Sequence, residues 1–190
     1  MLIYDIEIKR CILSKNEKPM VSNIVRDGWE NHGGMGVSCV CCYDYLDDRY
    51  RVFLEDNMAD FALLVAGRKI IVGFNNLGFD NKVLAHEGVG PYEQDLEYLN
   101  KKSYDIFEEI RSADGGWCSL DAMVKTNNLA TGKTGNGALA PVWYQEGRIG
   151  KLVDYCMADV WLTKKLFDKI LRGEALISSK TGQVINIRKP

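Results

Sequence analysis

The feature that most constrains the fold of this chain is a short β-prone segment near residue 1 that carries two acids. Residues 2–8 read Leu-Ile-Tyr-Asp-Ile-Glu-Ile, a composition typical of a buried strand. Residues i and i+2 of a strand point to the same face, so Asp5 and Glu7 project together. Two adjacent carboxylates repel each other and are costly to bury, and a divalent cation between them removes that cost. A half-exposed strand with a solvated acidic face explains the pattern equally well.

A further acid follows another apolar segment, at 69–74. That segment runs into the polar turn Asn75-Asn76-Leu77-Gly78 and then delivers Phe79 and Asp80. Ligand sites in α/β sheets gather at strand ends, where the loops open, so this order is typical of a site residue. Taken alone, the segment is better explained by Asp80 capping the helix that begins there.

One more acid lies within a long predicted helix, 148–171. Tyr155 and Asp159 are four residues apart and therefore share one face of that helix. Apolar residues such as Cys156 and Val160 surround Asp159, which favours a position near the packed side. Taken alone, a tyrosine in the core and an aspartate on the surface are the better explanation.

Taken together, the three segments supply four carboxylates and a phenol, from Asp5, Glu7, Asp80, Asp159 and Tyr155. Hard oxygen ligands without His or Cys suit Mg²⁺ or Mn²⁺. Four acids that bind two such ions are typical of sites that hydrolyse phosphodiester bonds. The ions activate the attacking water and stabilise the charge that develops on the phosphate. Without metal, four clustered acids cannot all stay ionised.

The segments also resemble, in order and spacing, the motifs of the DEDD 3′–5′ exonucleases, in the subgroup with Tyr in the third motif (DEDDy). The likeness is greatest to the proofreading exonuclease domain of family B DNA polymerases. Asp5–Glu7 matches the first motif, Gly73–Asp80 the second and Tyr155–Asp159 the third. The sister subgroup has His five positions before the last Asp, where this chain has Asp154. The resemblance spans residues 2 to about 170.

The resemblance implies an α/β ribonuclease H-like fold, a three-layer sandwich with a mixed, roughly five-stranded sheet and helices on both faces. It implies two metal ions, with Asp5, Glu7 and Asp159 as ligands of one and Asp5 with Asp80 as ligands of the other. It implies that Tyr155 orients the attacking water, since an ordinary tyrosine titrates near pH ~10 and is a poor base. By analogy, Asn75 and Phe79 contact the terminal nucleotide.

The remaining pattern predicts a single exonuclease-like domain over 1–190, near the roughly 150 residues of an average domain. We expect a hairpin over 36–54 and helices over 57–66, 105–112, 119–128 and 138–146. Residues 14–34 are expected to form an irregular loop excursion, and 130–137 a Gly-rich loop. Residues 172–190 are expected to be a tail with an edge strand at 184–187.

The net charge and the hydropathy of the chain limit the classes of binding partner that it can have. Lys and Arg total 24 and Asp and Glu total 26, a net charge of −2, which excludes a strongly basic nucleic-acid binder. It does not exclude an enzyme that touches nucleic acid through metal ions. We find no apolar run near the roughly 18 residues of a membrane span and no signal-peptide pattern. We therefore expect a cytoplasmic protein with no membrane partner.

The segment Cys39-Val40-Cys41-Cys42 invites a zinc interpretation, which we discount. A closed zinc site needs four ligands, usually as two spaced pairs, and His32 is the only other ligand type nearby. Alternation along a strand directs Cys42 away from Cys39 and Cys41. We expect these residues to be buried, reduced strand thiols.

The predicted activity is a metal-dependent 3′–5′ exonuclease acting on the 3′ end of single-stranded DNA, with two Mg²⁺ or Mn²⁺ ions per site. One alternative is an exoribonuclease on the same scaffold, since DEDDy domains also trim RNA. Another is a catalytically silent adaptor for nucleic acid or protein, although an adaptor has no physical need for four acids and a tyrosine. Without a polymerase domain, the exonuclease would act alone or as a subunit, with a replication or recombination protein as a candidate partner.

Overall fold

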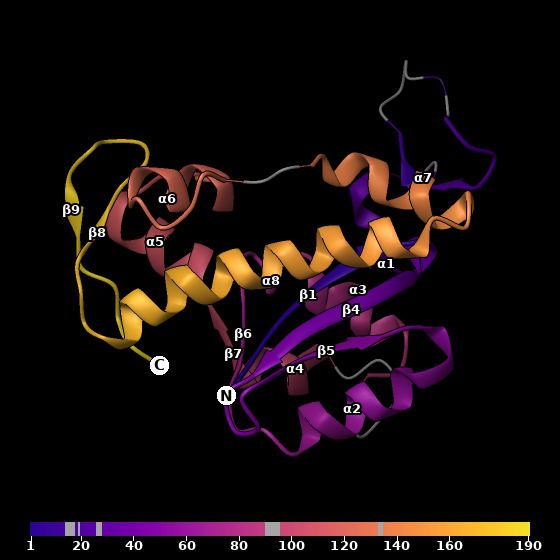
Figure 1. Ribbon diagram of the computed structural model, residues 1–190, viewed down its shortest axis with the longest axis horizontal. Coiled ribbons are helices and arrows are strands. Elements are labelled where there is room, and N and C mark those ends of the chain that lie inside the picture. The colour runs from indigo at the N-terminus through magenta and orange to yellow at the C-terminus, as the bar shows by residue number, and fades with distance from the viewer. Residues whose placement is uncertain (14–17, 19, 26–27, 90–95, 133–134) are drawn as a thin grey trace.

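A mixed five-stranded sheet forms the centre of the computed structural model (Figure 1), which describes residues 1–13, 18, 20–25, 28–89, 96–132 and 135–190. Its strand order is β5-β4-β1-β6-β7. The strands are β1 (Leu2–Ile8), β4 (Val37–Asp44), β5 (Arg49–Phe53), β6 (Ile71–Gly73) and β7 (Ser103–Asp105). β5, β4 and β1 pair antiparallel, whereas β1, β6 and β7 pair parallel. The hairpin expected over 36–54 is therefore present as β4 and β5.

Helices cover both faces of this sheet, because side chains alternate along its buried strands. Ile3 and Cys41 face one core, and Leu2 and Tyr4 face the other. The first core lies under α5 (Ile106–Asp114), α6 (Leu120–Thr126), α7 (Ala140–Gln145) and α8 (Ile149–Leu171). The second lies under α2 (Met58–Ala66), α3 (Asp80–His86) and α4 (Leu96–Lys102). The three layers agree with the fold class expected from the sequence.

The longest helix, α8, crosses the sheet in front of β1 and β4 (Figure 1). Its 23 residues follow the predicted bounds closely, and Leu152, Val160 and Phe167 bury its inner face. Among the residues that the structure describes, no helix is long and apolar enough to span a lipid bilayer.

The excursion expected to be irregular over 14–34 contains regular elements. β2 (Cys11–Ile12) pairs in parallel with β3 (Ile24–Val25), and a 3₁₀ turn, η1 (Gly28–Glu30), leads into the short helix α1 (His32–Met35). α1 packs on α3, and the Met35 side chain is fully buried there. This contact orders a polar, Gly-containing segment whose local sequence signals only a loop. Residues 14–17, 19 and 26–27 of that prediction lie outside the described part of the chain.

The tail does not extend the central sheet at 184–187. β9 (Val184–Ile185) pairs antiparallel with β8 (Leu176–Ile177) as a separate two-stranded sheet. Asn127, at the end of α6, accepts a hydrogen bond from the N–H of Ile177 at 2.8 Å and donates one to its carbonyl at 2.9 Å. This anchoring to α6 directs the tail away from the sheet edge.

Two further 3₁₀ turns are η2 (Glu55–Asn57) and η3 (Gly137–Leu139).

Candidate metal centre

Three of the predicted metal ligands meet between β1 and α8. β1 directs Asp5 and Glu7 toward the α8 face of the sheet, and α8 places Asp159 over them. One carboxylate oxygen from each of the three residues lies within 4.8 Å of the other two. Glu7 and Asp159 are buried, and Asp5 is half-buried. We call Asp5, Glu7 and Asp159 the acid triplet.

Asp80 reaches the same stretch of β1 along its open edge. β1 pairs with β6 at Leu2 and Ile3, and farther along β1 the N–H of Ile6 donates a hydrogen bond to Oδ1 of Asp80 at 3.3 Å. The fourth acid therefore binds the backbone between the two acids of β1. α3 begins at Asp80 with Phe79 in the N-cap position, so Asp80 is not the capping residue that its sequence context allowed.

Burial and neighbouring charges shift the pKa of Asp80. Burial raises the pKa of Asp80 to about 7, and the charges of Asp105 and Asp159 add to the rise. Hydrogen bonds from backbone N–H groups, including that of Ile6, oppose the rise without cancelling it. Without a cation, the Asp80 carboxyl therefore retains a proton for much of the time at neutral pH.

Asp105, at the end of β7, fixes the turn that precedes Asp80. Its carboxylate accepts hydrogen bonds from the N–H groups of Asn75 at 2.8 Å and Leu77 at 3.0 Å. It also accepts one from the N–H of Phe107 at 3.0 Å, in the first turn of α5. Sequence reasoning missed this residue. Asp before a helix is a recognisable N-cap signal, but nothing local connects Asp105 to a turn 30 residues earlier.

Buried amides hold the same turn from the core side. A Cβ on Gly73 would lie 2.6 Å from Cβ of Asn76, so glycine is needed for Asn76 to enter the core. Nδ2 of Asn76 donates to the hydroxyl of Tyr4 at 3.2 Å and to Oγ of Ser103 at 3.0 Å. The Tyr4 hydroxyl in turn donates to the side chain of Asn81. This network fixes the second motif by contacts that reach three strands.

Tyr155 lies against the Gly-rich loop that precedes α7. A Cβ on Gly135 would lie 2.7 Å from the Tyr155 ring, and one on Gly137 would lie 3.2 Å from its hydroxyl. Trp143 of α7 contacts the ring edge-on, with centroids 5.7 Å apart. The two glycines thus permit a close approach that positions the phenol beside Asp159. Residues 133–134 of the predicted loop lie outside the described residues.

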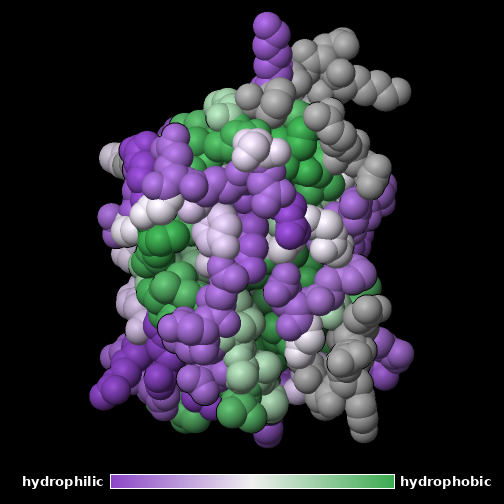
Figure 2. Space-filling view, turned by 90° about the vertical axis from the view of Figure 1, so that its right-hand side faces the viewer, coloured by the Kyte–Doolittle hydropathy of each residue, from purple (hydrophilic) through white to green (hydrophobic). Residues whose placement is uncertain are grey.

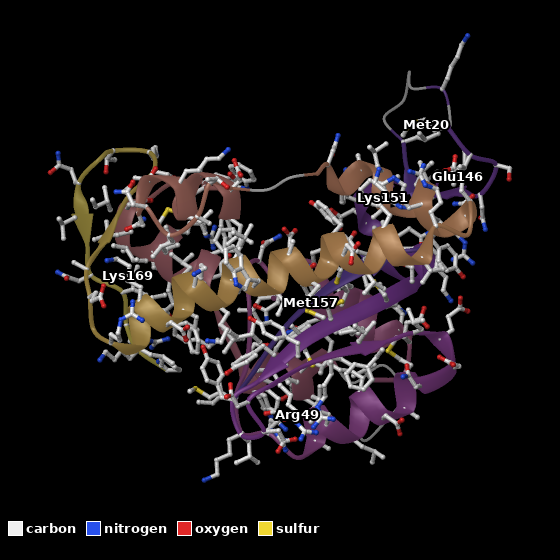
Figure 3. The ribbon with its side chains drawn as sticks, in the orientation of Figure 1. Met20, Arg49, Glu146, Lys151, Met157 and Lys169 are labelled. Atoms are coloured by element: carbon white, nitrogen blue, oxygen red, sulfur yellow. The ribbon has the colours of Figure 1, made fainter. Side chains whose placement is uncertain are left out.

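The acid triplet and Tyr155 line one end of a pocket of about 480 Å³, within the range of small-molecule sites. Most of the other walls are apolar, and they include Ile6, Ile8, Ile12, Met20, Trp29, Phe79 and Pro141. Figure 3 shows Met20 at the end of the molecule where α7 lies, and Figure 2 shows hydrophobic side chains gathered near the top of that end. A pocket that joins carboxylates to apolar walls suits a ligand with one charged end and one apolar end.

The two predicted substrate residues lie beside this pocket. Asn75 and Phe79 line a second, more polar hollow, which shares Asp5, Ile6, Trp29 and Phe79 with the first. Trp29 contacts Phe79 edge-on, with ring centroids 5.8 Å apart. Sequence reasoning missed Trp29, because it belongs to the segment expected to be irregular and has no motif around it.

We find no protein-family model and no curated protein that matches the chain. Among solved structures, the chain is similar to a family B DNA polymerase from the hyperthermophilic archaeon Pyrobaculum calidifontis, with a TM-score of 0.64 and 17% sequence identity. The match covers 90% of this chain and 24% of the polymerase, so the chain spans about a quarter of that protein's length. At this identity the similarity establishes the fold: the chain has the α/β architecture of one part of that polymerase.

Proposed function

We propose that this chain is a metal-dependent 3′–5′ exonuclease that hydrolyses phosphodiester bonds at the 3′ end of single-stranded DNA. The observation that carries the proposal is the acid triplet, whose oxygens lie within 4.8 Å of one another at the wall of a pocket. Clustered buried carboxylates destabilise a fold unless a cation binds them. A protein that only docked a partner would gain nothing from such an arrangement. The motif resemblance supports the same activity.

The donor atoms fit Mg²⁺ or Mn²⁺, because all of them are carboxylate oxygens. In the proposed site the acid triplet holds one ion, and Asp5 and Asp80 hold the other. When bound, such ions lower the pKa of a coordinated water and stabilise charge that develops on the phosphate. Because burial raises the pKa of Asp80 to about 7, this carboxyl must give up a proton to become a ligand. Metal binding is therefore expected to weaken as the pH falls below neutral.

Tyr155 is proposed to orient the attacking water. Its hydroxyl faces Gly137, and its ring is held by Trp143 on one side and the glycine loop on another. A phenol fixed in this way can hydrogen-bond a water without ionising, since an ordinary tyrosine titrates near pH ~10. Precise placement of a reacting group lowers the barrier by removing the entropy of bringing the reactants together.

The apolar walls of the pocket are proposed to receive the terminal base. Phe79 and Trp29 present aromatic surface beside Asp5, and aromatic rings stack on every base with little sequence preference. Asn75, in the neighbouring hollow, supplies a polar side chain for the sugar or base. With a net charge of −2, the chain has little long-range attraction for the phosphate backbone. These contacts would act only on the last nucleotides of a strand.

The proposal is tested by incubating the protein with 5′-labelled and 3′-labelled single strands of DNA and RNA, in Mg²⁺, Mn²⁺ or EDTA. We expect a metal-dependent ladder from 5′-labelled DNA and immediate release of the label from 3′-labelled DNA. Asp5→Asn is expected to lose activity by ~100-fold or more, because even residues that only orient metal ligands contribute roughly 10–100-fold. The exposed Asp154→Asn on α8 is the matched control.

Each other outcome has a defined meaning. Degradation of RNA without DNA would replace the proposed substrate with RNA. No metal-dependent degradation of either polymer, or equal activity in Asp5→Asn, would contradict an enzyme and favour an adaptor.

A further inference from the structure

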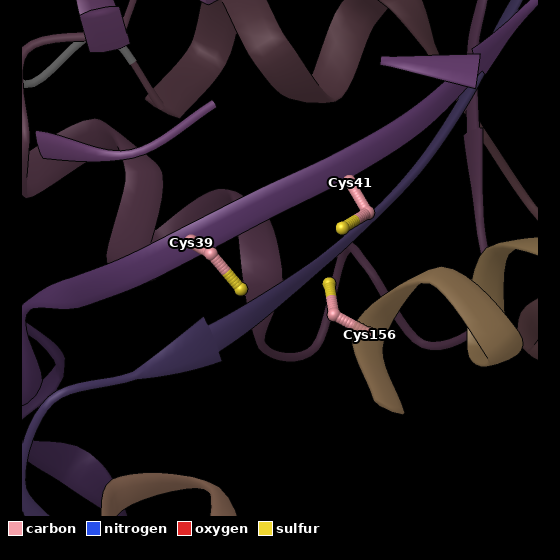
Figure 4. Close-up of side chains that lie close together, drawn as sticks. All are labelled: Cys39, Cys41 and Cys156. Carbon is pink, nitrogen blue, oxygen red and sulfur yellow. The ribbon is translucent and has the colours of Figure 1, made fainter. Parts of the chain in front are cut away.

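Three cysteines from two elements meet beneath α8. Cys39 and Cys41 project from β4, and Cys156 projects toward them from α8 (Figure 4). Their three sulfur atoms lie within 4.8 Å of one another, all three residues are fully buried, and none is in a disulfide. We call Cys39, Cys41 and Cys156 the thiol triplet. Sequence reasoning separated these residues, because Cys156 lies more than 100 positions after the other two and only the packing of α8 on β4 joins them.

The spacing of the sulfurs matches one shared ion. Thiolate sulfur binds zinc at ~2.3 Å, and an ion in the plane of three such sulfurs separates them by roughly 4 Å. The observed upper limit of 4.8 Å is close to that value. Side-chain rotation can close such a gap without moving the backbone of β4 or α8.

The surroundings of the sulfurs favour a soft cation. Sγ of Cys156 donates to the carbonyl of Asp5 at 3.4 Å, and Sγ of Cys41 donates to the carbonyl of Val153 at 3.8 Å. These hydrogen bonds are weak, and a bound cation would replace the protons that make them. Thiolates select ions such as Zn²⁺ and Cd²⁺ over Mg²⁺. A divalent ion also neutralises two of the three thiolates, which limits the charge that must be buried.

We propose that Cys39, Cys41 and Cys156 bind a thiophilic divalent cation such as Cd²⁺ through three sulfurs, a site distinct from a four-ligand closed zinc site and from the hard-ligand site of the acid triplet. Binding replaces thiol protons by the ion and releases them to solvent. It ties α8 to β4 at a point next to the carboxylates. The proposal does not depend on nuclease activity, because it rests on sulfur atoms that the proposed reaction does not use.

The test uses Cd²⁺, whose bonds to thiolates absorb in the ultraviolet whereas its bonds to carboxylates do not. Since the sulfurs are fully buried, the full chain is refolded from denaturant with Cd²⁺, excess Mg²⁺ and a phosphine reductant, and excess ion is removed by gel filtration. We expect one Cd²⁺ per chain with the thiolate absorption band. X-ray absorption spectroscopy of this sample is expected to show three sulfur neighbours.

Two serine variants locate the site. Cys156→Ser is expected to lower Cd²⁺ affinity by at least the roughly 10–100-fold that loss of an orienting group costs. Cys42→Ser, on the same strand but packed in the opposite core, is expected to leave the band unchanged. If Cys156→Ser does not fold, as judged by circular dichroism, Cys39→Ser takes its place. Asp5→Asn is expected to keep the band even though it loses nuclease activity.

The proposal is overturned if the wild-type chain refolds without a thiolate band, or if the band is equal in wild type, Cys156→Ser and Cys39→Ser. It is also overturned if the bound ion has only oxygen or nitrogen neighbours. In any of these cases the thiol triplet would be core packing alone.

Discussion

The acid triplet and the thiol triplet share one backbone plan. Each combines residues i and i+2 of a strand with one residue of α8, and the strands are adjacent. The antiparallel register sets Asp5 opposite Cys41 and Glu7 opposite Cys39. The helix residues of the two triplets are three positions apart, so they lie on neighbouring parts of the same face. Two ligand sets of opposite softness thus stand side by side on one sheet.

The difference between the triplets lies in charge and in access. The acid triplet lines a pocket, so cations can reach its carboxylates from solvent. Burial raises the pKa of the Cys156 thiol, and all three residues of the thiol triplet are fully buried. The comparison teaches that the same geometry yields a site open to solvent or one enclosed in the core, depending on which side chains it carries.

The largest expected effect comes from giving the thiol triplet a charge. Cys41→Asp places a carboxylate opposite Asp5, at a position with no exposed surface. An uncompensated buried charge costs about 3–5 kcal/mol. We expect denaturant unfolding at pH 8 in EDTA to show a loss of this size in the free energy of unfolding. Cys41→Asn, which has nearly the same shape without the charge, is the control; equal losses in both variants would assign the effect to polarity or size.

A slightly smaller effect on the free energy of unfolding is expected from removing the buried, ionisable carboxyl of Asp80. Its folded-state pKa of about 7, against an ordinary value of 3.8, corresponds to up to about 4 kcal/mol at 1.36 kcal/mol per pH unit. The folded state holds the proton between these pH values while the unfolded state has lost it. The stability of the metal-free wild type should therefore fall as the pH rises from about 4 to about 7.

Asp80→Asn should remove that decline. Measured by denaturant unfolding in EDTA, the variant should match the wild type near pH 4 and exceed it by up to the full linkage energy at pH 8. Addition of Mg²⁺ should reverse the order, because the ion stabilises only a folded state that has its ligands. Parallel pH profiles for the two proteins in EDTA would show that Asp80 ionises normally.

The third effect tests the helix residue of the acid triplet. Asp159→Asn is expected to reduce exonuclease turnover by ~100-fold, or about 2.7 kcal/mol, with thiolate–Cd²⁺ absorption retained. Asp154→Asn, one turn earlier and exposed, should keep full activity. If both variants lose activity alike, general damage to α8 and not loss of a ligand is responsible.

The smallest effect concerns Tyr155, which lies on α8 one residue before Cys156 of the thiol triplet and four before Asp159 of the acid triplet. Tyr155→Phe should slow turnover by about tenfold, less than the ~10²–10⁴-fold typical of a group that transfers a proton. Mg²⁺ binding, followed by the shift in unfolding temperature, should be retained. Tyr50→Phe, on β5 and partly exposed, is the control. A loss of metal binding in Tyr155→Phe would contradict the proposal that Tyr155 orients the attacking water without contributing to metal binding.

Local patterns allowed much of this arrangement to be predicted. Alternation put Asp5 and Glu7 on one face of β1, and the four-residue spacing put Tyr155 and Asp159 on one face of α8, because both periodicities depend only on neighbours in sequence. The structure places these residues in one pocket, with Asp80 in the neighbouring hollow and bonded to the N–H of Ile6. Their roles as metal ligands and as the water-orienting residue remain predictions.

What could not be predicted depends on contacts between distant segments. β7 has three residues and α4 has seven, and neither was predicted. Trp29 enters the pocket only because the excursion packs back on α3, and Cys156 joins β4 only because α8 crosses it. Such contacts follow from tertiary packing, which no window of neighbouring residues contains.

The hydrogen bond from Ile6 to Asp80 means that a side chain completes this edge of β1 where a strand would otherwise do so. Beyond the pairing of β1 with β6 at Leu2 and Ile3, the Asp80 carboxylate, and not a strand, accepts the N–H of Ile6. Lengthening β6 by two residues would pair this part of β1 with a strand and give a more regular sheet, but it would displace Asp80. A fully paired β1 edge and the observed position of Asp80 therefore exclude each other, so the incomplete pairing of β1 is what places the fourth acid there.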